Sequence, residues 1–149
     1  MAYDALPFID EHAVVVDVTP DRLWDAALET FTTSLGGTFG RAVAAALGCR
    51  PSTARRSPGV VGTTVPGFAV TSVDRPRVLV LEGRHRFARY AVALHVDDLG
   101  DSARCRLESR ADFPGVHGRL YRLVVIGSRG HVVVVRWLLR MVAENARQA

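Results

Sequence analysis

The stretch that decides the fold is RVLVLEGRHRFARYAVALHVDD, residues 77–98. Apolar and polar side chains alternate along it in two runs, Arg77–Phe87 and Arg89–Val96. Such alternation is typical of antiparallel strands with one buried and one solvated face. The predicted inner face comprises Leu79, Leu81, Gly83, His85, Phe87, Tyr90, Val92, Leu94 and Val96. The predicted outer face includes Glu82, Arg84, Arg86 and His95.

A third run, Ala103–Phe113, alternates in the same way. Its predicted inner positions are Cys105, Leu107, Ser109, Ala111 and Phe113. Its predicted outer positions are Arg104, Arg106, Glu108, Arg110 and Asp112. Opposite charges on one face of a sheet can pair across strands and contribute little each. We therefore expect a solvent-exposed outer face with ion pairs and no functional role.

The residues before this sheet predict one further strand and two helices. Glu11–Asp17 (EHAVVVD) is β-branched and apolar, as in a strand. Thr19-Pro20-Asp21 has the order of a helix start, with an N-cap, a proline at the first helical position and an acid near the positive end of the dipole. Gly36-Gly37 ends that helix, and a second one spans Arg41–Leu47 before Gly48.

The residues after Phe113-Pro114-Gly115 return to helical spacing. The predicted buried stripe is Leu120, Val124, Gly127, His131, Val134, Leu138 and Val142. Four valines at Val132–Val135 also suit a strand. The pattern is much longer than an ordinary strand, so it predicts one helix over Val116–Ala146, bent at Gly127 and Gly130.

The length of 149 residues fits one domain over residues 1–149, and the order of the predicted strands and helices makes it α+β. Hydrophobic residues make up 48% and charged residues 23% of the chain, an ordinary globular balance. No signal peptide and no apolar run of membrane-spanning length is visible, which predicts a cytoplasmic protein. The net charge is +4, but the basic residues are all arginines spread along the chain among acids. We therefore expect no nucleic-acid partner.

This order of elements resembles the SRPBCC superfamily, the START/Bet v 1-like helix-grip fold that includes polyketide cyclase-like proteins. The resemblance is carried by EHAVVVDVTPDRLWDAAL at 11–28, by residues 77–98, and by ESRADFPGVHGRLYRLVVIGSRGH at 108–131, which looks like a bacterial subgroup. It implies a curved antiparallel sheet around a long C-terminal helix, with a cavity between them. Members bind lipids, sterols, polyketides or hormones, and a minority are cyclases, aromatases or dehydratases. No catalytic residue is carried over.

Two histidines are predicted to face the interior, His85 from a strand and His131 from the last helix, with His117 near that helix's start. An inward imidazole can orient a ligand oxygen or act as acid or base. It can equally be a core histidine bonded to Ser109, Tyr90 or a backbone carbonyl. Pockets are mainly apolar, so Phe68, Phe113 and Tyr121 are predicted as walls. The predicted ligand-binding set is His85, Tyr90, Ser109, Phe113, His117, Tyr121, His131 and Phe68.

No cofactor or metal site is predicted. The sequence has no HExxH, GxSxG, GxxxxGK[ST] or GxGxxG motif. Cys49 and Cys105 lack metal-ligand spacing and are predicted as free core thiols.

Three functions compete. A binder of an apolar small molecule predicts a cavity with one or two polar groups. An enzyme acting on a polyketide-like substrate needs two converging titratable groups. A protein-interaction module predicts a filled interior and an exposed apolar patch. The binder is our leading hypothesis, and the sequence defines neither the ligand nor the oligomeric state.

Overall fold

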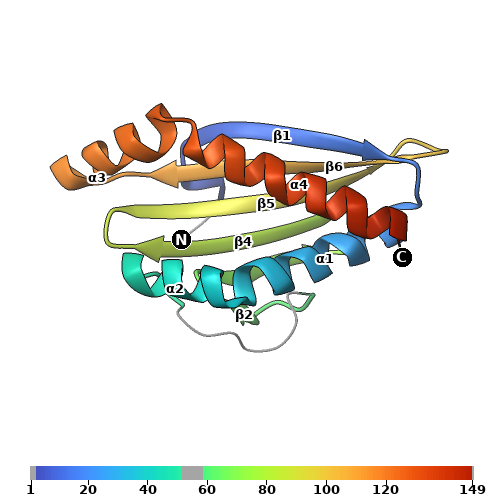
Figure 1. Ribbon diagram of the computed structural model, residues 1–149, viewed down its shortest axis with the longest axis horizontal. Coiled ribbons are helices and arrows are strands. Elements are labelled where there is room, and N and C mark those ends of the chain that lie inside the picture. Colours follow the sequence, from blue (N-terminus) through green and yellow to red (C-terminus); the bar gives the residue numbers. More distant parts are fainter. Residues whose placement is uncertain (1–2, 52–58, 149) are drawn as a thin grey trace.

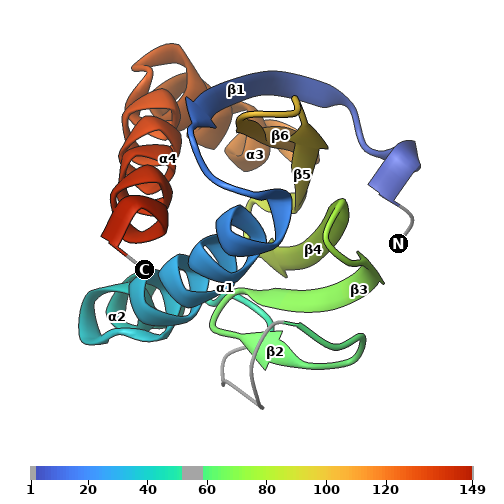
Figure 2. The same ribbon diagram turned by 90° about the vertical axis from the view of Figure 1, so that its right-hand side faces the viewer.

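The computed structural model describes residues 3–51 and 59–148. Within these residues, six strands form one antiparallel sheet in the order β1-β6-β5-β4-β3-β2. The strands are β1 (Phe8–Val16), β2 (Thr64–Val65), β3 (Phe68–Asp74), β4 (Val78–His85), β5 (Ala88–Asp98) and β6 (Ala103–Asp112). The sheet is curved, as Figure 2 shows. The alternation in residues 77–113 therefore predicted β4, β5 and β6 correctly, whereas it did not single out β2 and β3.

The helices lie on one side of the sheet (Figures 1 and 2). They are α1 (Pro20–Gly36), α2 (Thr38–Leu47), α3 (Gly115–Arg122), the π-helical turn η2 (Leu123–Gly127) and α4 (Gly130–Gln148). A short 3-10 helix, η1 (Tyr3–Ala5), precedes β1. This arrangement confirms the predicted helix-grip architecture, with a long C-terminal helix held against a curved antiparallel sheet. No helix in the described residues is both long and apolar enough to span a bilayer.

The predicted helix boundaries follow from local chemistry. Thr19 is the N-cap of α1, and its hydroxyl accepts a hydrogen bond from the Arg22 N–H at 3.4 Å. Gly48 ends α2 in the left-handed conformation, with φ of 67°, which a glycine adopts without a Cβ penalty. The helix α2 begins at Thr38, three residues before the predicted start at Arg41.

The hydrophobic core fills one end of the space between sheet and helices. Its largest fully buried side chains are Trp24, Phe31, Leu23, Leu79, Leu81, Leu94 and Leu107. The last three turns of α4 close this end with Val135, Leu139, Val142 and Ala146. Among the described residues, three hydrogen bonds join α1 to α4. Arg22 Nε donates to the Ala146 carbonyl at 2.7 Å, Arg22 Nη2 donates to the Arg147 carbonyl at 3.2 Å, and Asn145 Nδ2 donates to Thr30 Oγ1 at 2.9 Å.

The C-terminal segment departs from the single predicted helix. It is helical through Val132–Val135, as expected, but it breaks between η2 and α4, where Arg129 has a φ of 60°. A π turn adds a residue to the helical turn, so it shifts the phase of every later position. The predicted stripe was wrong in part, both before the break and after it. Leu120, Val124 and Val134 are exposed, whereas Val135 and Leu139 are buried.

The outer face of the sheet is also less exposed than predicted. Glu82 is buried, and the Tyr3 ring lies 4.8 Å beneath the Arg110 guanidinium, so the segment around η1 covers part of that face. Ion pairs do cross the strands, as between Arg106 Nε on β6 and Asp97 Oδ2 on β5, which lie 2.7 Å apart. Arg110 Nε lies 2.6 Å from Glu108 Oε1 within β6, and Glu82 forms no ion pair with another described residue. Both cysteines are free and buried.

Candidate functional site

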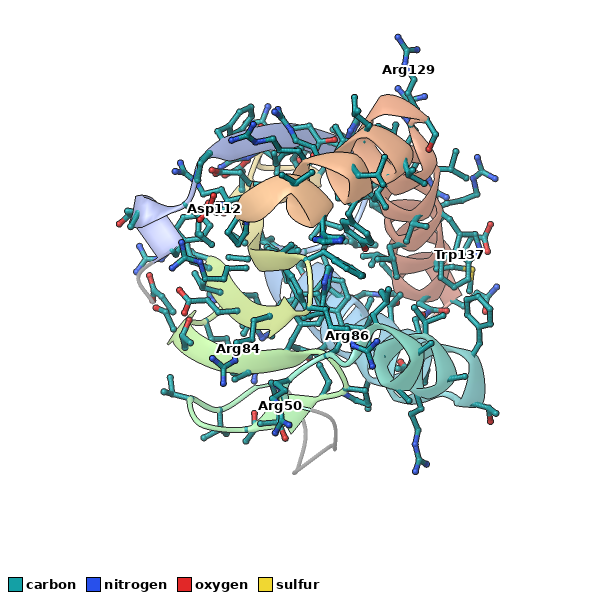
Figure 3. The ribbon with its side chains drawn as sticks, turned by 90° about the vertical axis from the view of Figure 1, so that its left-hand side faces the viewer. Arg50, Arg84, Arg86, Asp112, Arg129 and Trp137 are labelled. Carbon is teal, nitrogen blue, oxygen red and sulfur yellow. The ribbon has the colours of Figure 1, made fainter. Side chains whose placement is uncertain are left out.

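A cavity of about 410 Å³ occupies the end of the grip that the core leaves open. The second half of β6, the first half of β5 and the end of β4 form one wall, and α2, α3, η2 and the start of α4 form the other. Four exposed side chains line its rim, Phe39 and Val43 on α2 and Val134 and Trp137 on α4. Figure 3 shows Trp137 on the outer side of α4, above α2. The cavity therefore opens to solvent between these two helices.

Aromatic rings form the wall at the end of β4. The Tyr121 ring lies 4.8 Å from the His85 ring and 6.2 Å from the Phe113 ring, measured between centroids. On the other side, the Tyr90 ring lies 5.4 Å from His85 and 5.1 Å from Phe68. The structure thus brings five of the predicted site residues into one continuous cluster.

Gly83 makes room for Tyr90 in this wall. The two residues are paired across β4 and β5. A Cβ at Gly83 would lie 1.9 Å from the Gly67 carbonyl oxygen and 2.7 Å from Tyr90 Cε2. The Tyr90 hydroxyl donates to that same carbonyl at 2.7 Å, and burial raises the tyrosine pKa. Tyr90 is therefore a fixed, neutral part of the wall.

His85 offers a free hydrogen-bond donor to the cavity. Its Nδ1 accepts from the Phe87 backbone N–H at 3.1 Å, so the neutral ring carries its proton on Nε2. Burial lowers the pKa of His85, which favours this neutral form. The Nε2 atom has no hydrogen-bond partner among the described residues, and the half-buried Tyr121 hydroxyl has none either. Both groups can bond a ligand oxygen.

A second polar group lies where β1 and β6 meet α4. His131 Nε2 is 3.1 Å from Ser109 Oγ and 3.2 Å from Asp10 Oδ1. The other oxygen of Asp10 is 3.1 Å from His12 Nε2. Asp10 and Ser109 share one nitrogen of His131, whereas a Ser-His-Asp triad uses opposite nitrogens. The group is therefore a hydrogen-bonded network and lacks the geometry of an activated serine.

Seven of the eight predicted site residues line the cavity: Phe68, His85, Tyr90, Ser109, Phe113, Tyr121 and His131. His117 does not, because it lies exposed on α3. Sequence reasoning missed Asp10, although extending the alternation of β1 back by two residues from His12 places it on the inner face. It also missed the rim residues of α2 and Trp137.

Within residues 3–51 and 59–148, no group of three or more histidine, cysteine or acidic side chains is arranged to hold a metal ion.

The chain matches no protein-family model and no curated protein sequence. It is similar in structure to CalU16 from Micromonospora echinospora, with a TM-score of 0.56 and 14% identity over 92% of this chain and 64% of that one. DynU16, from the dynemicin biosynthetic locus, matches with a TM-score of 0.53 and 15% identity over 87% and 45% of the two chains. Norcoclaurine synthase from Thalictrum flavum matches with a TM-score of 0.52 and 15% identity over 91% and 93%.

At these identities the likeness concerns the fold alone. The six-stranded antiparallel sheet, the C-terminal helix and these neighbours agree with the resemblance in the sequence. The chain has a START/Bet v 1-like helix-grip fold.

Proposed function

We propose that the protein binds an apolar small molecule that carries an oxygen atom, inside the cavity between the sheet and α4. The observation that carries this proposal is the composition of the cavity wall. Apolar and aromatic side chains surround about 410 Å³, a volume within the usual range of small-molecule sites. The free donor on His85 and the hydroxyl of Tyr121 lie together in that wall.

The free donor defines the chemistry of the ligand. A neutral imidazole that donates from Nε2 matches a carbonyl, hydroxyl or ether oxygen. Among the described residues, the cavity wall contains one arginine, Arg110, whose guanidinium already pairs with Glu108. Because a buried carboxylate without a partner is costly, a neutral oxygen suits this cavity better than an acid. Lipid-, polyketide- and isoprenoid-like ketones and alcohols have this chemistry.

The structural neighbours support a role in small-molecule chemistry without defining the ligand. DynU16 belongs to a biosynthetic locus, and norcoclaurine synthase was solved with a transition-state analogue. Fold alone does not separate binding from catalysis.

Filling the cavity tests the proposal. Val92 lines it from β5, so Val92→Trp should occupy the space and abolish the binding of an environment-sensitive apolar fluorophore. Val78→Trp is the matched control, because Val78 lies on β4 outside the cavity lining. Unchanged fluorophore binding in Val92→Trp would contradict the proposal. Native mass spectrometry of wild-type protein from its own host then identifies the retained molecule.

Acid–base catalysis on such a ligand is the second candidate. One observation favours it: Asp10 and His131 are two titratable groups within hydrogen-bond distance, and His131 lines the cavity. Nδ1 of His131 has no hydrogen-bond partner among the residues that the structure describes. To test catalysis, the molecule identified by mass spectrometry is incubated with each protein. The wild type should convert it chemically, and His131→Gln should leave it unchanged.

A further inference from the structure

One long segment of the chain is basic and apolar without any acid. Between Asp112 and Glu144 there is no aspartate or glutamate, whereas the segment contains Arg119, Arg122, Arg129, Arg136 and Arg140. Asp112 itself pairs with Arg89. None of the five arginines forms an ion pair with another described residue. This part of the surface therefore carries uncompensated positive charge.

The same segment exposes an apolar face. Val116, Leu120, Leu123 and Val124 in α3 and η2 are 76%, 60%, 70% and 62% exposed. Gly118 is the one buried residue of α3, and η2 has none. The inner side of α3 is the side of Tyr121, which reaches the aromatic wall of the cavity. The four aliphatic side chains are mostly exposed and therefore lie away from the buried side of the helix.

The arginines border this apolar face. Arg119 and Arg122 lie on the same two turns, and Arg129 projects from the corner between η2 and α4 at the tip of the molecule (Figure 3). A helix with exposed Leu and Val beside arginines is the pattern of a segment that lies in a membrane interface. The long arginine side chains can keep their charge at headgroup level while the aliphatic groups insert.

Charge decides between a membrane and a second copy of this chain. A two-fold dimer sets the same patch against itself, so Arg119, Arg122 and Arg129 would meet their own counterparts with no acid between them. An anionic bilayer supplies both the negative charge and the apolar layer.

We infer that α3 and η2 dock the protein on an anionic lipid surface, next to the cavity to which Tyr121, Val125 and Ile126 contribute from the inner side of the same helices. Docking there brings the cavity to the surface from which an apolar ligand is taken. The purpose of docking rests on the proposed function, whereas the docking itself does not.

The experiment is vesicle co-sedimentation of the full chain without added ligand, at physiological ionic strength. The vesicles are phosphatidylcholine with and without phosphatidylglycerol. Leu120→Gln with Val124→Gln should lower the affinity for anionic vesicles about tenfold or more. Arg119→Gln with Arg122→Gln should lower it about thirtyfold. Each variant replaces exposed side chains, so far-UV circular dichroism should match the wild type.

The matched control variants replace the same types of exposed side chain outside α3 and η2. Val60→Gln with Val61→Gln removes two exposed valines, and Arg50→Gln with Arg84→Gln removes two exposed arginines on the side of the molecule away from α3 (Figure 3). Both controls should bind vesicles as the wild type does. Absent vesicle binding, equal loss in the controls, or a dimer at sedimentation equilibrium that Leu120→Gln with Val124→Gln dissociates would each overturn the inference. If vesicle docking fails but the wild-type protein still binds the apolar fluorophore, the proposed function is unaffected.

Discussion

The two inward histidines have different surroundings although their sequence signals are alike. His131 bonds two side chains, Asp10 and Ser109, and Ser109 is buried. His85 accepts one bond from a backbone N–H two residues away and keeps its other nitrogen free. The first is therefore held by the protein, and the second is available to a ligand. Strand alternation for His85 and helical spacing for His131 predict only the direction of the side chain, so they could not distinguish the two roles.

Substitution by leucine should separate these roles. His131→Leu leaves Asp10 and Ser109 without this partner, which should cost about 1–3 kcal/mol of unfolding free energy. His85→Leu should cost less, because only the Phe87 N–H loses a partner, yet it should weaken the binding of an oxygen-bearing ligand. Urea unfolding of both variants measures the first effect, and ligand titration measures the second. Equal stabilities for His131→Leu and wild type would show that the network contributes nothing.

At the scale of elements, β5 and β6 are joined on their outer face by one carboxylate. Asp97 on β5 accepts from Arg106 at 2.7 Å and from Arg104 at 2.9 Å, both on β6. Hydrogen bonds from Arg106 and then Arg104 lower the pKa of Asp97 to about 2, against partial burial, which raises it. The folded protein therefore holds this carboxylate ionised more strongly than the unfolded chain does.

The effect on stability has a defined sign. Because the folded-state pKa lies below the ordinary 3.8, the contribution is complete above about pH 4 and is lost as the pH falls through about 2. Asp97→Asn should therefore be less stable than wild type at pH 7, by on the order of 1 kcal/mol for partly exposed pairs. The two should converge near pH 2. Urea midpoints at both pH values measure this, and a constant gap between them would contradict it.

How far the elements follow from sequence depends on their periodicity. The three strands after Arg77 alternate along most of their length, so the sequence predicted their positions and their inner faces. The C-terminal segment has apolar residues on several sides, because it packs on the core at one end, lines the cavity in the middle and exposes a face at α3. One helical stripe cannot describe three environments. The break at Arg129 also shifts the register of the positions after it, where Val134 is exposed and Val135 is buried. Leu120 and Val124 precede the break and lie on the face that α3 and η2 expose.

At the scale of the whole molecule, the grip has a filled end and a hollow end. Figure 1 shows the start of α1 and the end of α4 at one end of the molecule, with α2 and α3 at the opposite end. The filled end holds Trp24 and Phe31, whereas the hollow end is the cavity. The sequence could predict which side chains of each strand face the helices. It could not predict where packing stops, because that depends on how closely α2 and α4 approach the sheet.

This division should appear in amide hydrogen exchange of the ligand-free protein. Local opening is easiest where few apolar side chains are buried. In α4, Val135, Leu139, Val142 and Ala146 are buried, whereas the first turn is half-exposed and α3 buries only Gly118. Amides of Leu139–Ala146 should therefore exchange at least about tenfold more slowly than those of α3 and η2, which corresponds to a difference of about 1.4 kcal/mol in opening free energy. The comparison uses one continuous C-terminal segment under one set of conditions. Uniform protection from Val116 to Ala146 would mean that the two ends open together and that the cavity end is as rigid as the core.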